Sequence, residues 1–544
     1  MKRFLVCALV LGWSMVSVSE AQTTSVQDLH VNGDAQFDGT LSFGHPSGVT
    51  DAIQYAAPNG AARSVSSKLG DVVNVLDFPG CDPTGNADST ACIQNAVDSS
   101  AGKTLDISGT YRISAPITIT KALKIRGAKG QAVLRLSTPN QNGIVLGDGT
   151  DATKGQLYYT SIDGLQIAPA EGVAASTSGA ALLLRNVGFI DIGDLVIYGA
   201  DSQGSKLFNG IVSEVASEYK IIRPRFSNLN GSGITTTGTD TQAHRNVDLF
   251  LIEPLFTGIN GDCIYFGAFS EGQTVTLPVA YQNNAWFLHI NSPTTMNGFN
   301  YFVTTPDIEL DGTGQGIFVE QGSNLWVTGG WIGSNTAIGS MALKLSSAGS
   351  SHHFSNVEFS EVTATIDAPA TSFTGSTFTG DNATQTVGVT VTDNATDFQF
   401  HGGRIRQYTQ YGISLSANAF RPSITGVSFK NIGVQEVSGA NNTNVAEVSS
   451  IQSDAPFSLA AVASLPLRYG RHFIQVNGST PIVNMTVLAP GTNITVQAGS
   501  GGITFNGSPT LILKQNETSL NVPAFSIVQF TTDGNTWFET SRNF

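Results

Sequence analysis

The chain has 544 residues, a formal net charge of −14 and only 12% charged residues. Its length favours two to four folded units. Glycine is abundant, with 59 residues, and phenylalanine (30) far exceeds methionine (5), a composition that favours strands and turns over helices. The negative charge argues against a surface that binds nucleic acid or anionic membrane as a whole. A single local basic groove remains compatible with it.

The first residues predict export. Lys2 and Arg3 precede an apolar run from Phe4 to Val18, and small residues follow up to Ala21. This is the pattern of a secretory signal peptide, residues 1–21, cleaved near Ala21. A membrane anchor is the weaker alternative because the apolar run is short, and no later segment approaches the about 18 apolar residues that span a bilayer. We therefore expect a secreted, extracellular protein without membrane insertion.

Residues 22–68 are polar and predict a stalk or collar, and residues 69–115 predict a cap on the domain that follows. The stretch "NADSTACIQNAVDSSAG" contains a short helical pattern. Asp88 or Ser89 can cap this helix, and its expected apolar stripe consists of the residues Ala91, Ile93, Ala96 and Val97.

The cysteines fit an oxidising compartment. Cys81 and Cys92 bracket the loop "CDPTGNADSTAC", and we expect a disulfide between them. Cys263 lies among apolar residues and is expected to be a buried free thiol. The cysteines and histidines show no spacing typical of metal ligands.

From about Thr104 to Val437 the chain repeats one pattern. A short β-rich segment is followed by a pause, which is a break at a Gly, Asn or charged residue, and then by a second alternating segment. The pauses form two runs with spacings of 19–30 residues, the first at Gly164, Gly193, Arg223 and Glu253 and the second at Gly329, Asn356, Gly375, Gly402 and Gly426. A loose period of this length made of strands predicts a solenoid. A parallel β-helix over residues 116–450 fits better than a propeller, and several β-sandwiches are the alternative. Residues 451–544 predict a separate small β domain, in which Asp533-Gly534 is a hairpin turn.

One segment, "VVNVLDFPGCDPTGNADSTACIQNAVDSSAGKTLDISGTYRISAPITI", carries a family resemblance. It resembles the N-terminal signature of the pectate-lyase-like, rhamnogalacturonase/epimerase-type superfamily of right-handed β-helices. The residues in matching places are Phe78, Gly85, Asp88, Thr90, Ile93, Gln94, Gly109, Thr110 and Tyr111. The usual Gly-Asp-Gly and Thr-Asp-Asp-Thr runs read "DPTGN" and "ADST" here. Because the match covers only about 45 residues, which form a structural end-piece, it implies the fold and leaves the reaction open.

Two flanking stretches, "ARSVSSKLGDVVNVLDF" and "GNTWFETSR", resemble segments of phage tailspikes of this superfamily. That resemblance implies a homotrimer that binds or cuts surface polysaccharide.

Acidic residues mark one candidate site. In "TPDIELDGTG", Asp307, Glu309 and Asp311 alternate with apolar residues and leave one side of a strand; Glu320 in "GIFVEQG" can join them. Alternate residues stand about 6.6 Å apart along a strand, near the about 6.5–9.5 Å carboxyl separation of inverting glycosidases. Three interpretations stay open: a solvated surface, acid–base hydrolysis, and a Ca²⁺ site.

Aromatic residues cluster in the same part of the sequence. Trp286, Trp326, Trp331 and Tyr301 are close in the chain, and flat aromatic rings beside acids suit sugar binding. The alternative is packing in the solenoid core or at an interface.

A basic stretch points to a different chemistry. Arg404 and Arg406 share one strand side in "HGGRIRQYTQY", with Tyr408 nearby, and Arg223 and Arg225 repeat the theme in "YKIIRPRF". Such groups can neutralise a uronate carboxylate during β-elimination. The alternative is that the arginine stems cover strands and meet acids on other coils.

The sequence thus predicts an exported all-β protein: a right-handed single-stranded parallel β-helix with an N-terminal capping helix and a C-terminal β domain. A polysaccharide is the expected partner, and glycoside hydrolysis by Asp307, Glu309, Asp311 and Glu320 is the first expected activity. A polysaccharide lyase and a non-catalytic, tailspike-like adhesion protein are the alternatives. No cofactor is expected, with Ca²⁺ as the one alternative.

Overall fold

The computed structural model describes residues 54–55, 63–64, 70–147, 149, 156–238, 245–293, 300–311, 313–334, 340–439, 444–449, 451–453, 458–468 and 472–544. The chain divides into two compact units, Met1–Asp71 and Val72–Phe544. In the first unit, β1 (Gln54–Tyr55) and β2 (Arg63–Ser64) form an antiparallel pair. The predicted signal peptide lies outside the described residues, as does most of the predicted stalk.

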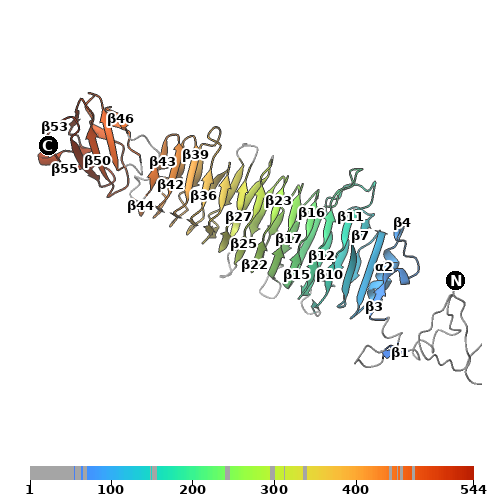
Figure 1. The fold of residues 1–544 in the computed structure, drawn as a ribbon. Helices are drawn as coiled ribbons and strands as arrows, with labels where there is room; N and C mark the ends of the chain where they lie inside the picture. The colour runs from blue at the N-terminus through green and yellow to red at the C-terminus, as the bar shows by residue number, and fades with distance from the viewer. Residues whose placement is uncertain are drawn as a thin grey trace, which may run out of the picture. The chain divides into compact units, whose positions relative to one another are not determined.

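The second unit consists mainly of short strands that stack side by side in parallel ladders (Figure 1). Each turn of the chain contributes one strand to each of three ladders, which we call sheets A, B and C, in that order. The result is a parallel β-solenoid of about 16 turns, as predicted from the repeated sequence pattern. The right-handed sense of the coil remains a prediction from the family resemblance.

The strands fall into these ladders by their pairing. Sheet A contains β3 (Val72–Asn74), the starts of β5 (Thr104–Ile113) and β7 (Lys124–Leu136), β10 (Ser161–Asp163), β13 (Asp191–Gly193), the end of β15 (Asn209–Ile222), β18 (Asn246–Ile252), β22 (Gln273–Thr276), β25 (Tyr301–Thr304), β28 (Leu325–Thr328), β32 (His353–Ser355), β35 (Ser372–Thr374), β38 (Gln399–His401), β41 (Ser423–Thr425) and β44 (Glu447–Ser449). Sheet B contains β4 (Thr84–Asp88), the ends of β5 and β7, β11 (Gln166–Pro169), β14 (Val196–Tyr198), β16 (Arg225–Ser227), β19 (Leu255–Thr257), β23 (Val279–Tyr281), β26 (Asp307–Glu309), β29 (Trp331–Gly333), β33 (Glu358–Ser360), β36 (Thr377–Thr379), β39 (Arg404–Tyr408), β42 (Ser428–Ile432) and β45 (Gln452–Ser453). Sheet C contains β6 (Ile117–Ile119), β8 (Ile144–Leu146), the starts of β12 (Ala180–Gly188) and β15, β17 (Ile234–Thr237), β20 (Ile264–Phe266), β24 (Trp286–Asn291), β27 (Gln315–Ser323), β30 (Met341–Leu345), β34 (Thr363–Ile366), β37 (Val387–Val391), β40 (Tyr411–Leu415) and β43 (Gln435–Ser438). The short strands β9 (Leu157–Tyr158), β21 (Ser270–Glu271) and β31 (Gly349–Ser350) pair in the corner between sheets C and A.

The corner from sheet A to sheet B turns on a single residue with a left-handed backbone, with φ between 46° and 71°. These residues are Gly164, Asp194, Arg223, Glu253, Leu277, Thr305, Gly329, Asn356, Gly375, Gly402 and Gly426. The pauses predicted from the sequence coincide with them except at Gly193, where the turn residue is the next one, Asp194. Glycine adopts this conformation without steric cost, which explains why the pauses that fall on glycine are visible in the sequence.

Inward side chains of successive turns stack in register and form the core. Phe373 lies between Phe354 and Phe400 in sheet A, with ring centroids 4.9 and 5.3 Å away, and Phe359 stacks on Phe378 in sheet B at 4.4 Å. All five rings are buried. Because strands repeat along the coil, one residue type can occupy the same place in several turns, and this register carries outward side chains into rows as well.

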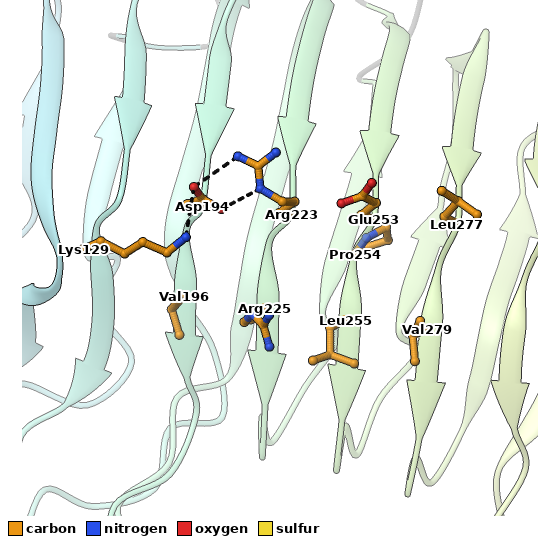
Figure 2. Close-up of a pocket in the computed structure, with 10 residues that line it drawn as sticks. All are labelled: Lys129, Asp194, Val196, Arg223, Arg225, Glu253, Pro254, Leu255, Leu277 and Val279. Carbon is orange, nitrogen blue, oxygen red and sulfur yellow. Dashed lines mark hydrogen bonds and ion pairs between the residues drawn. The ribbon is translucent and has the colours of Figure 1, made fainter.

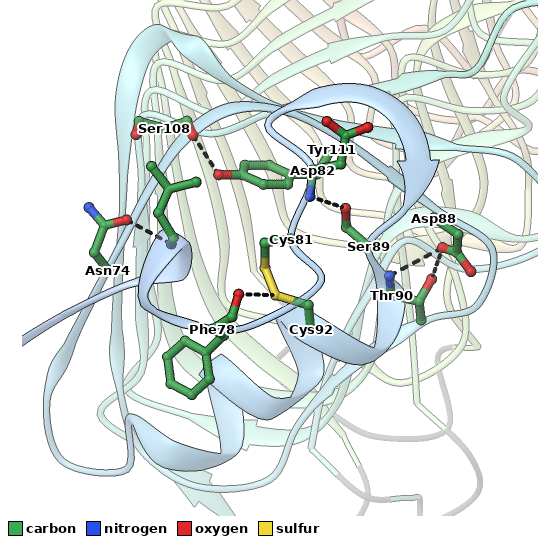
Figure 3. The surroundings of a disulfide bond; sticks show 11 residues. Asn74, Phe78, Cys81, Asp82, Asp88, Ser89, Thr90, Cys92, Ser108 and Tyr111 are labelled. Atoms are coloured by element: carbon green, nitrogen blue, oxygen red, sulfur yellow. Dashed lines mark hydrogen bonds between the residues drawn. A yellow bond between two sulfur atoms is a disulfide. The ribbon is translucent and has the colours of Figure 1, made fainter.

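The N-terminal end carries the predicted helix, α2 (Thr90–Ser99), with Ser89 as its N-cap residue. The Ser89 hydroxyl accepts from the Asp82 backbone N–H (3.0 Å), and Asp88 accepts from the Thr90 N–H (3.1 Å) and hydroxyl (2.6 Å) (Figure 3). The helix therefore begins with an ordered network that ties it to the preceding loop.

Cys81 and Cys92 form the predicted disulfide, with a Cα–Cα distance of 5.4 Å (Figure 3). The buried face of α2 therefore differs from the predicted one: Cys92 is buried together with Ile93, Ala96 and Val97, whereas Ala91 is exposed. The prediction that Ala91 belongs to the apolar stripe was wrong, since the disulfide draws the neighbouring residue inward.

After the solenoid the chain forms three further sheets. Their strands are β46 (Ser458–Ala460), β48 (Phe473–Asn477), β50 (Asn493–Ala498), β54 (Ile527–Thr532), β55 (Trp537–Arg542) and β52 (Leu511–Ile512) in one sheet, and the pairs β47 (Ser464–Leu465) with β49 (Asn484–Met485) and β51 (Ile503–Asn506) with β53 (Ser519–Val522). The predicted Asp533-Gly534 hairpin joins β54 to β55. Among the described residues, no helix is long and apolar enough to cross a membrane.

Candidate functional site

The outer face of sheet C carries an unusual row of side chains. Tyr265, His289, Phe318 and Lys344 occupy the same outward position on four successive strands, β20, β24, β27 and β30. On each strand the flanking residues point inward and are buried. The coil therefore places a phenol, an imidazole, a phenyl ring and an ammonium group in line, one turn apart each.

Both nitrogens of His289 face carboxylates. Nδ1 lies 2.9 Å from Oδ2 of Asp262, and Nε2 lies 3.1 Å from Oε2 of Glu320. The His289 and Asp262 side chains are only 15% and 16% exposed, whereas Glu320 is 43% exposed. Asp262 is held in turn, because its Oδ1 accepts from the backbone N–H of Trp286 (3.1 Å). The result is a fixed inner acid, an oriented imidazole and an outer acid that solvent can reach.

The hydrogen-bond inventory of this triad leaves room for one further proton. A neutral imidazole donates from one nitrogen only, and an ionised carboxylate only accepts. When Nδ1–H is donated to Asp262, Nε2 and the Glu320 carboxylate face each other as two acceptors. A proton taken up by this pair would complete the contact between them, so the pair can act as a base at the exposed end of the row.

Aromatic rings surround this triad. The ring of Phe318 lies 4.7 Å from that of His289 and 5.0 Å from that of Trp286, and Nζ of Lys344 lies 4.8 Å from the Phe318 centroid. Tyr265 meets His289 edge-on at 5.0 Å. Burial raises the pKa of the Tyr265 phenol, and the nearby charges of Glu320 and Asp262 add to the shift, so this phenol stays protonated and able to donate.

The four predicted catalytic acids do not lie together. Asp307 and Glu309 project from the outer face of sheet B on β26, and Asp311 follows that strand near the turn toward sheet C. Glu320 projects from sheet C. The prediction that Glu320 joins the other three was wrong, because the chain turns a corner of the solenoid between β26 and β27. Asp307 and Glu309 remain a pair on one strand side.

The predicted aromatic group is divided in the same way. Trp286 belongs to sheet C, Trp326 to the outer face of sheet A and Trp331 to the outer face of sheet B. Tyr301 is not a surface residue: it is 1% exposed and its hydroxyl donates to the carbonyl oxygen of Ser270 (2.8 Å). Its assignment to substrate binding was therefore wrong. Closeness in sequence placed these rings within a few turns but on different faces.

Trp331 has a defined neighbourhood on sheet B. It pairs with Asp307 on the adjacent strand, and Gly333 pairs with Glu309. A Cβ atom on Gly333 would lie 2.4 Å from Cζ2 of Trp331, so the indole lies against this glycine. The acid pair and the indole consequently share one small surface.

The predicted basic centre also needs correction. Arg404 and Arg406 project from sheet B on β39, where Nε of Arg406 donates to the hydroxyl of Thr379 (3.0 Å). Tyr408 is fully buried and its hydroxyl donates to the carbonyl oxygen of Val362 (2.8 Å). A lyase centre that contains Tyr408 is therefore wrong, because no substrate can reach the phenol.

The other basic stretch lines a groove of about 460 Å³ at the corner of sheets A and B (Figure 2). Arg223 donates to Asp194 at 2.8 and 3.1 Å, and Lys129 lies 3.4 Å from the same carboxylate. These cations lower the pKa of Asp194, Arg223 most strongly. Arg223 thus meets an acid on the neighbouring coil, as the alternative interpretation of these arginines holds.

Neither the acidic strand nor the triad is arranged as a metal site in the part of the chain that the structure describes. Among the described residues, no group of three or more His, Cys, Asp or Glu side chains is arranged to hold a metal ion. In the triad this follows from geometry, since Asp262 and Glu320 stand on opposite sides of the His289 ring. The Ca²⁺ alternative for the acidic strand remains a prediction.

Asp262, Tyr265, His289 and Lys344 were not predicted as a group from the sequence. Their one available signal was the repeat itself, since aligned coils would have placed Tyr265, His289, Phe318 and Lys344 in one register. Cys263, beside Asp262, is buried and free as predicted. Burial raises its pKa well above the usual range.

No protein-family model matches the chain, and no curated protein matches it in sequence. Among solved structures it is similar to tailspike protein 3 of bacteriophage CBA120, with 15% identity over 91% of this chain and 74% of that chain and a TM-score of 0.52. The pre-mature gene product 12 of bacteriophage phi29 (11% identity, 81% and 67% covered, TM-score 0.47) and the A-module of the Azotobacter vinelandii mannuronan C-5 epimerase AlgE6 (15%, 71% and 100%, 0.46) are more distant. The likeness is one of fold: the chain has the parallel β-helix architecture that its N-terminal signature predicts.

Proposed function

We propose that this protein is a polysaccharide-cleaving enzyme whose acid–base centre lies on the outer face of sheet C. The observation that supports this proposal most directly is the placement of His289 between Asp262 and Glu320, with contacts of 2.9 and 3.1 Å. The substrate class is supported by the superfamily resemblance and by the similarity in fold to a tailspike protein. The aromatic rings beside the triad support it too, because sugar C–H faces pack on such rings.

The chemistry that these groups suit best is β-elimination from a uronate-containing polymer. The Glu320–His289 pair takes the proton from the carbon next to the uronate carboxylate, and the resulting electron pair forms a carbon–carbon double bond as the glycosidic C–O bond breaks. Tyr265 donates a proton to the departing oxygen. Lys344 supplies the positive charge that the carboxylate needs while its neighbouring carbon loses a proton.

Asp262 has a positioning role in this scheme. Its two oxygens are engaged by the Trp286 N–H and by Nδ1 of His289, so it fixes the ring and the nitrogen that faces Glu320. Groups held in this way lose little freedom when the substrate binds, which is the physical benefit of a preorganised site.

Hydrolysis, the first activity predicted from the sequence, is the second candidate and uses a different face. Asp307 and Glu309 stand on alternate positions of β26, beside Trp331. Their spacing along the strand, about 6.6 Å, falls within the range of inverting glycosidases. The specific observation in its favour is that this acid pair shares its surface with an indole.

The test is an assay of the secreted protein on uronate polymers and on neutral glucans, with two readouts. Elimination produces reducing ends together with the ultraviolet absorbance of an unsaturated uronate; hydrolysis produces reducing ends alone. For the sheet C centre we expect both signals on a uronate polymer. Glu320→Gln and His289→Gln should each lower kcat/KM at least about 100-fold, the usual contribution of acid–base catalysis.

Two variants serve as controls. Thr365→Ala changes the next outward residue of the same row beyond Lys344 and should leave activity unchanged. Asp307→Asn with Glu309→Gln should also leave elimination unchanged and would abolish hydrolysis if sheet B is the active face. Full activity in Glu320→Gln and His289→Gln would refute the sheet C centre, and glycan binding without either product would assign the protein to adhesion.

We also propose that the protein is exported and acts as a homotrimer. The disulfide between Cys81 and Cys92 supports export, because such bonds persist in oxidising compartments. The tailspike-like flanking segments support the trimer. Light scattering of the mature protein and N-terminal sequencing of the secreted form test these two points.

A further inference from the structure

A second surface, on a different face of the solenoid from the acid–base row, has the features of a ligand site. On the outer side of sheet A, near the corner from sheet C, a hollow of about 560 Å³ is lined by Tyr159, Phe189, Asp191, Glu218, Lys220, Asp248 and Phe250. Its residues come from the turns between β9 and β18, on sheet A, whereas the row begins on β20 in sheet C. The proposed catalysis uses none of these residues.

The aromatic part of the hollow is a platform of exposed rings. The rings of Tyr159 and Phe189 are stacked, with centroids 5.5 Å apart and an interplanar angle of 12°. Tyr159 is 75% exposed and Phe189 and Phe250 are each 41% exposed. Tyr158 supports the platform from the side, 5.7 Å from Phe189. Rings that stay exposed in parallel pairs offer a sugar the apolar face that its C–H groups require.

The backbone aims these side chains outward together. Tyr159, Phe189, Glu218 and Asp248 occupy the same corner position on successive turns, and each has a left-handed backbone, with φ of 58°, 50°, 50° and 55°. The next turn has Gly272 there, and a Cβ atom on it would lie 2.3 Å from Oδ1 of Asp248. The missing side chain thus leaves room for the Asp248 carboxylate to lie over that turn.

Charge decides which sugar fits. Three carboxylates, those of Asp191, Glu218 and Asp248, line the hollow against the single ammonium group of Lys220. An anionic sugar would be repelled there, whereas a cation is attracted both by the carboxylates and by the faces of the aromatic rings. Burial raises the pKa of Asp248, and the neighbouring charge of Glu271 raises it further, which is consistent with an excess of negative charge at this place.

We propose that this hollow is a binding site for a glycan segment that carries a protonated amine, such as a glucosamine unit, and that it anchors the protein at a glycan other than the one it cleaves. The sugar ring stacks on Tyr159 and Phe189, and its ammonium group pairs with Asp191, Glu218 and Asp248. No covalent step is involved.

The experiment is calorimetric titration of the full-length mature chain with a glucosamine hexamer, using its fully N-acetylated form as the matched neutral probe. The two probes share backbone and linkage and differ only in the charged amine. We expect the amine form to bind at least tenfold more tightly, with an advantage that shrinks at high salt. Equal affinity for the two forms, or no binding of either, would overturn the proposal.

Variants locate the site. Tyr159→Ala removes a highly exposed ring and Asp191→Asn removes one carboxylate without changing shape, so neither threatens the fold; each should weaken binding of the amine hexamer at least fivefold. Phe420→Ala, at another exposed ring (45%) far along the coil, is the control and should bind normally. Unchanged binding in both hollow variants would refute the assignment. A hexalysine peptide that binds as tightly as the amine hexamer would refute the sugar class. Glu320→Gln should retain full binding, which separates this site from the proposed active site.

Discussion

His352 provides a sharp test of how the solenoid interior handles a titratable group. It is fully buried in the corner that leads into β32. Its Nδ1 accepts a hydrogen bond from the Leu325 N–H (3.4 Å), and its Nε2 has no hydrogen-bond partner among the described residues. Burial lowers the pKa of His352 from 6.5 to about 3, and the neighbouring His353 contributes to the shift.

This lowered pKa makes stability depend on pH in one direction. Above pH 6.5, His352 is neutral in both the folded and the unfolded chain, and it makes no difference. As the pH falls below 6.5, the unfolded chain binds a proton that the folded chain refuses until about pH 3. The free energy of unfolding therefore falls by about 1.4 kcal/mol per pH unit in this window. At about pH 4.5 the loss from this residue amounts to about 2 to 3 kcal/mol.

The assay is urea unfolding of the wild type and of His352→Gln at several pH values from neutral to about pH 4.5. Glutamine keeps an acceptor for the Leu325 N–H but does not titrate. We expect the variant to lose less stability than the wild type as the pH falls, whatever its stability at neutral pH. His353→Gln, at a partly exposed neighbour whose pKa burial also lowers, should remove a smaller part of the slope. Identical pH slopes in the wild type and His352→Gln would refute the reasoning.

Three further predictions concern the scaffold. Reduction of the Cys81–Cys92 disulfide, which closes a loop with a sequence separation of 11, should destabilise the N-terminal cap by about 3 kcal/mol, measured as faster hydrogen exchange in α2; unchanged exchange would contradict this. Gly402→Val should cost about 1–2 kcal/mol because valine is strained at φ 66°, whereas Gly402→Asn should cost less, and equal urea midpoints for the two variants would show that the corner tolerates any side chain. The Cys263 thiol is buried and its pKa is raised, so a thiol reagent should label it only after unfolding; rapid labelling of the native protein would place it at the surface.

Much of the fold could be predicted from local signals in the sequence. The corner residues between sheets A and B stand out because glycine and asparagine accept a left-handed backbone. Asp194, Leu277 and Thr305 have the same left-handed conformation, but their residue types do not indicate it. One pause was therefore predicted at Gly193 instead of Asp194, and the corners at Leu277 and Thr305 were not predicted. The capping helix and the disulfide were also predicted, although the buried face of the helix contains Cys92 and not Ala91.

The candidate site could be predicted only in part, since Glu320 and Trp286 were identified but were grouped with the wrong partners. Alternation along a strand correctly paired Asp307 with Glu309, because that relation is local. It could not show that Glu320 and Asp307 face different directions, or that Tyr301 points inward, since both depend on which side of the coil each strand occupies.

The sequence by itself determined that the chain coils, roughly where each turn bends and how its N-terminal end is closed, because those properties reside in a few neighbouring residues and their backbone preferences. Only the tertiary structure decided which side chains meet. Asp262, His289 and Glu320 come from three different turns, and their contact depends on the register in which each strand re-enters sheet C. Loop length is free to vary in a solenoid while strand register is not, so the register aligns these groups across distances in sequence that no local pattern spans.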